Sequence, residues 1–126
     1  MSQATLKPLT LDDVTVTLEC LPEDVPVRGN AMASGDPDVN RETEEWIFSE
    51  LSAGNDWAWA CAKVTVRWGE FTGDDYLGAC SYRNEADFVA DGYYSDMVAS
   101  ALDDLNQTMA RTFASLSARV IVDGAK

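Results

Sequence analysis

The chain has 126 residues, enough for one domain with its own hydrophobic core and too few for two. Hydrophobic residues make up 46% and charged residues 25%, a composition typical of a globular protein rather than a disordered tail. Twenty-two Asp and Glu against nine Lys and Arg give a formal net charge of -13, which excludes a phosphate-tracking nucleic-acid binder and argues against docking on anionic membranes. The chain has no His, which excludes imidazole metal ligands and Ser-His or Cys-His catalysis.

The N-terminal residues lack the apolar run of a signal peptide, and no later stretch approaches the ~20 apolar residues of a membrane span. Cys20, Cys61 and Cys80 are odd in number and far apart, with no Cys-x-x-Cys pair. Free thiols of this kind are typical of a reducing compartment, so we expect a cytoplasmic protein.

The first half of the chain predicts a strand and then a helix. Residues 14–20 alternate between apolar and polar side chains, the period of a half-buried strand. A long loop without periodicity follows from Val27 to Gly35, and whether it orders on binding stays open. Asp36 can then cap a helix that begins at Pro37 and ends before Gly54. Its predicted buried stripe is Val39, Thr43, Ile47 and Leu51, widened by Trp46 or Phe48.

Residues 57–68 predict a second strand, which pairs with a third around 76–82 as an antiparallel hairpin. The alternation places Ala58, Ala60 and Ala62 on one face, where a helix can lie close. We expect Trp68 on that same face to be part of the core. The glycine- and aspartate-rich residues 69–75 form the predicted turn.

The last part predicts a helix capped by Asn84, a break at Asp91-Gly92 and a long amphipathic helix from about 94 to 119. The apolar residues 120–122 could add an edge strand. The predicted fold is therefore one α+β domain over residues 1–126, in the order β-α-β-β-α, with an antiparallel sheet packed against one or two helices. We expect flexible ends at residues 1–11 and 123–126.

Tests for known chemical motifs argue against an enzyme. Asp36 opens a run that resembles a calcium loop, but Arg41 and Ile47 stand where that loop needs Gly and Glu. The glycines match no phosphate-binding motif, and the adjacent carboxylate pairs show no cleft in which two acids would face each other. We therefore expect no catalytic residue, no metal and no cofactor.

Two tryptophans give a stronger signal. Trp57 and Trp59 share the predicted strand face with Lys63 and Arg67, so a normal apolar layer does not easily cover them. Exposed Trp flanked by charges is typical of a protein-protein hot spot. Trp57 and Trp59 are thus candidate aromatic anchors for a partner, with core packing as the open alternative.

The carboxylates can be spaced like the phosphates of a nucleic acid. Acids at i, i+3 or i+4 on a helix lie about 5 to 6 Å apart, and acids at i, i+2 on a strand about 6.6 Å. Rows of this kind are expected on the first helix, at the tip of the hairpin and on the last helix. The candidate acidic partner-binding residues are Asp38, Glu42, Glu45, Asp74, Asp75, Asp96, Asp103 and Asp104.

The blocks 56–68, 76–82 and 93–97 carry a loose resemblance. The sequence here resembles small acidic proteins of unassigned function from bacteriophages, plasmids and integrated elements, over roughly residues 14–106. The resemblance implies the cytoplasm of a bacterial host cell and a role against host defences, such as inhibition of restriction or CRISPR complexes. It brings no catalytic motif.

These observations favour a non-enzymatic inhibitor or adaptor that imitates DNA and binds a basic protein surface, without direct contact to nucleic acid or membrane. The alternative is an assembly module that forms a homodimer through the exposed sheet face, its charge serving solubility.

Overall fold

The computed structural model describes residues 5–31 and 34–121. It confirms one α+β domain in the predicted order β-α-β-β-α. The elements are the strands β1 (Thr15–Pro22), β2 (Ala60–Trp68) and β3 (Phe71–Cys80), the helices α1 (Pro37–Ser52), α2 (Glu85–Ala90) and α3 (Tyr93–Ser117), and the 3-10 turns η1 (Leu11–Asp13) and η2 (Asp56–Ala58).

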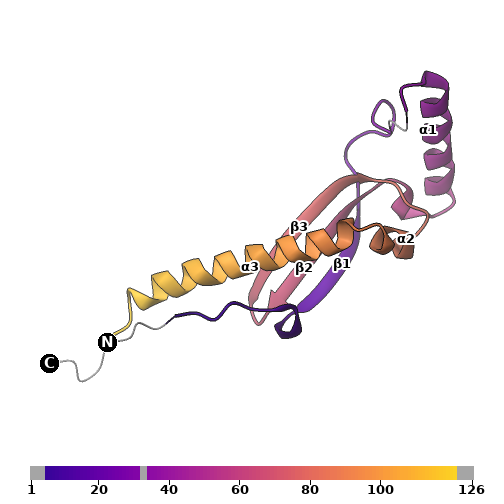
Figure 1. Ribbon diagram of the computed structural model, residues 1–126. Helices are drawn as coiled ribbons and strands as arrows, with labels where there is room; N and C mark the ends of the chain where they lie inside the picture. Colours follow the sequence, from indigo (N-terminus) through magenta and orange to yellow (C-terminus); the bar gives the residue numbers. More distant parts are fainter. Residues whose placement is uncertain (1–4, 32–33, 122–126) are drawn as a thin grey trace.

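The three strands form one antiparallel sheet in the order β1-β2-β3. Thr15 lies opposite Arg67, and Val66 lies opposite Gly73. Helix α3 crosses one face of this sheet and packs on β2 and β3 (Figure 1). The predicted helix over the alanine face is therefore confirmed, and no helix of the described residues packs on the other face of the sheet.

The close approach of α3 to the sheet depends on Gly73 of β3. A Cβ atom built on Gly73 would lie 2.2 Å from the backbone oxygen of Ala101 and 2.5 Å from the backbone nitrogen of Leu105. The side chains of Ala62, Val64 and Val66 lie between β2 and the helix and are fully buried. Small residues on both elements thus let the helix axis come near the sheet.

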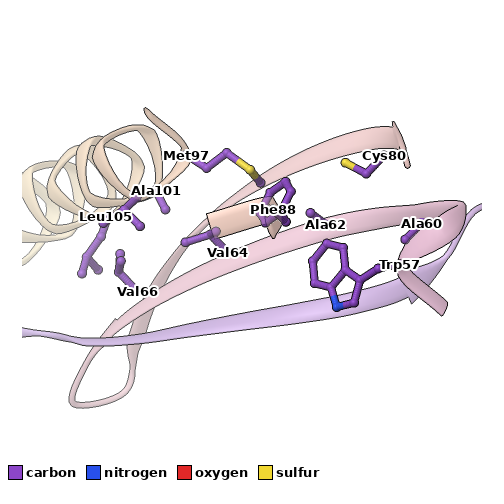
Figure 2. Packing of buried hydrophobic residues seen from close by; sticks show 11 residues of the cluster. Trp57, Ala60, Ala62, Val64, Val66, Cys80, Phe88, Met97, Ala101 and Leu105 are labelled. Atoms are coloured by element: carbon purple, nitrogen blue, oxygen red, sulfur yellow. The ribbon is translucent and has the colours of Figure 1, made fainter. Parts of the chain in front are cut away.

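An aromatic group closes one end of this core. The ring of Phe88 stacks on Trp57, with centroids 4.8 Å apart (Figure 2). It also meets the rings of Tyr82 and Tyr94 edge to face. The hydroxyl of Tyr82 donates a hydrogen bond to Asp91 over 2.5 Å. Helix α2 is therefore anchored through one fully buried side chain, Phe88.

The predicted strand 57–68 begins later than expected. Asn55 caps the turn η2 by accepting a hydrogen bond from the backbone N–H of Trp57, so β2 begins at Ala60. This turn takes Trp57 off the face that carries Lys63, and its ring lies in the cluster with Ala60, Ala62 and Phe88. The expectation that Trp68 is a core residue is wrong: it is the last residue of β2, next to the turn, and its side chain is 44% exposed.

Helix α1 stands apart from the sheet (Figure 1). Ile47 is its one buried residue, whereas Val39 of the predicted stripe is exposed. Its neighbours are the loop after β1 and the turn η2, and the second hydrophobic cluster consists of Val27, Ala31, Ile47, Ala58 and Trp59, with Leu51 packed against it. The buried stripe of α1 is narrower than predicted because the helix packs on a loop and a turn rather than on a sheet.

The chain ends are partly held. The Asn106 side chain accepts a hydrogen bond from the N–H of Leu9 over 2.8 Å and donates one to its carbonyl oxygen over 3.0 Å. Leu9 therefore does not belong to a freely flexible end, and Leu11 begins the turn η1. Val120 and Ile121 are not in a strand. Val122 and the predicted end 123–126 lie outside the described residues.

Among the helices of the described part, none is long and apolar enough to cross a membrane.

Candidate functional site

Helix α1 presents a row of carboxylates to solvent. Asp38, Glu42 and Glu45 follow one another at i, i+4 and i+7, and all are exposed. At 3.6 residues per turn these positions share one face, opposite the buried Ile47. The row has its position because the opposite face of α1 holds the second hydrophobic cluster.

This row is largely unneutralised. The only ion pairs within residues 5–31 and 34–121 are Arg41 with Asp38 and Arg28 with Glu44, each at 3.4 Å. The Arg41–Asp38 pair is exposed, and a pair of that kind contributes about 0–1 kcal/mol to stability. Glu42 and Glu45 have no such partner in the described part of the chain, so their charge faces solvent.

Glu44, next to the row, has a different role. Its carboxylate accepts a hydrogen bond from the backbone N–H of Gly29 over 2.8 Å and pairs with the Arg28 guanidinium. That guanidinium also lies 5.1 Å from the centroid of the Phe48 ring. These contacts tie the described part of the long loop to α1.

The prediction that Asp74 and Asp75 lie at the hairpin tip is wrong. Trp68 lies opposite Phe71, so the turn is as short as Gly69-Glu70 and both aspartates are inside β3. The Asp74 side chain accepts a hydrogen bond from the Thr65 hydroxyl over 2.9 Å. The Asp74 backbone N–H donates to the Asp104 carboxylate over 3.0 Å, which brings these two predicted residues together.

The remaining predicted acids, Asp96 and Asp103, are exposed on α3. Asp103 accepts a hydrogen bond from the Gln107 amide over 2.7 Å. The predicted acids therefore form two groups on different elements, one on α1 and one on β3 and α3. In the α1 group, the carboxylates of Glu42 and Glu45 accept no hydrogen bond from a described backbone or side-chain group.

The predicted aromatic anchors are core residues. Trp57 is 9% exposed and stacks on Phe88, and Trp59 is 7% exposed with its indole N–H donating to the carbonyl oxygen of Val25 over 2.7 Å. The interpretation of Trp57 and Trp59 as exposed anchors is therefore wrong. The turn η2 brings the Trp57 ring onto Phe88, and α1 together with the loop after β1 covers Trp59.

Another tryptophan is exposed instead. Trp46 is 39% exposed and follows Glu42 by one helical turn. Sequence reasoning assigned it to the margin of the buried stripe. Trp46 lies four residues after Glu42, and this helical spacing could have predicted its place beside the carboxylate row.

A cleft of about 420 Å³ opens at the end of β1, beside α1 and η2. Its lining mixes apolar side chains with carboxylates and contains no cation. The lining residues are Cys20, Leu21, Pro22, Glu23, Asp24, Val25, Pro26, Val27, Leu51, Asp56 and Trp59. Sequence reasoning missed this cleft, because its walls come from two stretches, residues 20–27 and 51–59, that are separated in the chain by the long loop and most of α1.

The Cys20 thiol lines this cleft, and its pKa reports on the burial and charge around it. Burial, and then the nearby Asp56 carboxylate, raise the pKa of Cys20 from its ordinary 9.0 to about 11. Above pH 9 the unfolded chain loses this proton before the folded one does, so folding stability falls as pH rises from about 9 to about 11. We expect the melting temperature of Cys20→Ala to fall less over this range than that of the parent chain. If the melting temperatures of Cys20→Ala and of the parent chain fall equally with pH, the Cys20 thiol is not buried beside Asp56 as described.

The uncovered sheet face is mostly polar. A shallow depression of about 270 Å³ on it is lined by Thr17, Glu19, Lys63, Thr65, Arg67, Thr72 and Asp74. Homodimer interfaces are more apolar than this face. No observation therefore favours the alternative dimer through the sheet face. In the part of the chain that the structure describes, no group of three or more Cys, Asp and Glu is placed to hold a metal ion.

Comparisons with protein-family models, with curated proteins and with solved structures give no match for this chain. Its function is therefore inferred from its own residues.

Proposed function

We propose that the chain is a non-enzymatic acidic inhibitor or adaptor that binds a basic, nucleic-acid-binding surface of another protein. The observation that carries this proposal is the exposed row Asp38, Glu42 and Glu45 on α1, of which only Asp38 is paired with a cation in the described residues.

The spacing of the row suits a phosphate-binding surface. Carboxylates one helical turn apart lie about 5 to 6 Å from each other at their Cβ atoms. A surface that binds a nucleic acid carries Lys and Arg side chains set to meet successive phosphates. Because the row is rigid and already solvent-exposed, such a partner would meet it without rearrangement of the helix.

Apolar contacts next to the row would add binding energy that salt does not screen. Trp46 follows Glu42 by one helical turn and is 39% exposed. Aromatic anchors surrounded by charges are typical of interface hot spots. Binding would therefore weaken with salt and keep a salt-resistant remainder.

The proposed target is a nucleic-acid-handling component of a bacterial defence system, in the cytoplasm of the host cell. This choice follows the resemblance to small acidic proteins of mobile elements. In that role the chain would occupy the channel where the target holds DNA or RNA, so the target would lose its nucleic acid as the chain binds.

Charge reversal on α1 tests the proposal. Partners are first captured from a bacterial lysate on the tagged chain and identified by mass spectrometry at low and high salt. We expect Glu42→Lys/Glu45→Lys to bind the captured partner at least tenfold more weakly, and we expect duplex DNA or RNA to compete with the parent chain. Affinity is measured by isothermal titration calorimetry.

The control carries the same change in net charge elsewhere. Asp12 and Glu70 are exposed and lie outside α1. Asp12→Lys/Glu70→Lys should leave the affinity within about threefold, because residual long-range repulsion is screened beyond about 10 Å at 0.1 M salt. Equal weakening by both double variants would show a general charge effect and would remove α1 as the binding surface.

A further inference from the structure

The cleft at the end of β1 is separate from the acidic row on α1. Leu51, which packs on the second hydrophobic cluster, lines the cleft, whereas Glu42 and Glu45 lie on the face of α1 opposite Ile47. The chain leaves β1 there and rises to α1, on the side of the molecule away from both termini (Figure 1). A partner held by the row alone would leave this cleft empty.

The walls of the cleft are held by contacts within the chain. The ring of Trp59 is 7% exposed, and its indole N–H donates to the carbonyl oxygen of Val25 over 2.7 Å. The Glu23 carboxylate accepts hydrogen bonds from the backbone N–H of Val25 over 3.3 Å and from that of Ala79 over 3.2 Å. The two prolines of the lining fix their own φ angles. The cleft is therefore formed without a ligand, and little ordering has to accompany binding.

Two other carboxylates of the lining are unneutralised. Asp24 and Asp56 are exposed, and within residues 5–31 and 34–121 neither side chain accepts a hydrogen bond or forms an ion pair. Arg28 follows the last residue of the loop wall, but its guanidinium pairs with Glu44 and lies over the Phe48 ring. The cleft thus combines apolar walls with negative charge.

This combination fits an arginine side chain. Such a side chain carries a cation on an aliphatic stem, so the stem can cover apolar walls while the head stays at the carboxylates. The planar guanidinium has N–H donors on more than one edge, which suits carboxylates from two walls, here the loop after β1 and the turn η2. An anion fits poorly, since burial, and then Asp56, already raise the pKa of the Cys20 thiol.

We propose that this cleft binds an arginine side chain presented by a peptide segment of a partner. Free arginine fits less well, because its own carboxylate would meet the acidic lining, whereas in a peptide that group is a neutral amide. A second copy of the chain also fits less well, because two chains of net charge -13 repel each other. This inference does not depend on the row on α1.

Titration of the full chain with N-acetylarginine amide, followed by NMR at low salt, tests the proposal. We expect the signals of the Trp59 indole N–H and of backbone residues 20–27 to shift, with a dissociation constant on the order of 1 mM for a ligand of this size. N-acetylcitrulline amide, in which a neutral urea replaces the guanidinium, should bind at least about tenfold more weakly, because it lacks the charge-assisted hydrogen bonds. Free arginine should also bind more weakly.

Three results of this titration would overturn the proposal. The first is the absence of shifts at about 10 mM N-acetylarginine amide, well above the expected dissociation constant. The second is equal binding of the citrulline amide, which would mean that the cation is not recognised. The third is equal binding of free arginine, which would exclude a site selective for an arginine within a peptide.

Matched variants locate the site. Asp24→Asn/Asp56→Asn should weaken binding of N-acetylarginine amide at least about fivefold, and because both residues are exposed, circular dichroism should show an unchanged fold. Asp12→Asn/Glu70→Gln removes the same charge from exposed positions outside the cleft and should change binding by less than about twofold. Equal weakening by both double variants would overturn the proposal. The probe is a small molecule, so this result is obtained whether or not the row on α1 binds a partner.

Discussion

Replacing Gly73 with alanine is expected to destabilise the protein by about 3 kcal/mol or more. The added methyl group would lie 2.2 Å from the Ala101 carbonyl oxygen and 2.9 Å from the Leu105 Cα atom. Both are backbone atoms of α3, which cannot rotate away as a flexible side chain can. The helix must therefore lift from β3, and its contacts with β2 are lost at the same time. Urea unfolding followed by far-UV circular dichroism measures the change.

Gly78 provides the matched control on the same strand. A Cβ atom there would meet only the Glu23 carboxylate, at 3.4 Å, which is an ordinary contact. Gly78→Ala should change the free energy of unfolding by less than about 1 kcal/mol. The change can be stabilising, because alanine restricts the unfolded chain more than glycine does. Similar losses at both positions would mean that glycine flexibility in β3, rather than close helix packing, matters.

Replacing Phe88 with alanine is expected to cost about 3–5 kcal/mol, the usual range for deleting a buried phenyl ring. The ring is fully buried between Trp57, Tyr82 and Tyr94, so its removal leaves a cavity that these large rings cannot fill without moving. It is also the one buried residue of α2. We therefore expect α2 to detach before the rest of the domain unfolds.

Val89 is the neighbouring control, since it is exposed on the same helix. Val89→Ala should change stability by no more than about 0.5 kcal/mol. Hydrogen exchange monitored by NMR would show early loss of protection in α2 for Phe88→Ala only. If Phe88→Ala unfolds as cooperatively as the parent chain and loses under 1 kcal/mol, the ring is not the anchor of α2.

The kind and order of the main elements follow from local signals in the amino-acid sequence. The alternation along β1, the Asp36 cap of α1 and the 3.6-residue period of α3 are local signals, and the structure follows them. The placement of Asp38, Glu42 and Glu45 on one face of α1 needs only helical spacing. The net charge is a sum over residues, so the sequence gives it without knowledge of the fold.

Which face each aromatic ring occupies depends on tertiary packing. The turn η2 replaces the predicted start of the strand and places Trp57 in the cluster beneath α3, whereas Val27, Ala31 and Ile47 cover Trp59. Trp68, with strong alternation in its favour, is 44% exposed at the end of β2 next to the turn. Burial depends on what packs above a residue, which no local pattern contains.

The same reason applies to the binding surfaces. The cleft at the end of β1 needs Pro22, Leu51 and Asp56 in one place, and the approach of Asp74 to Asp104 spans 30 residues. Local periodicity builds each element, and the packing of one element on another decides which of its faces remains free.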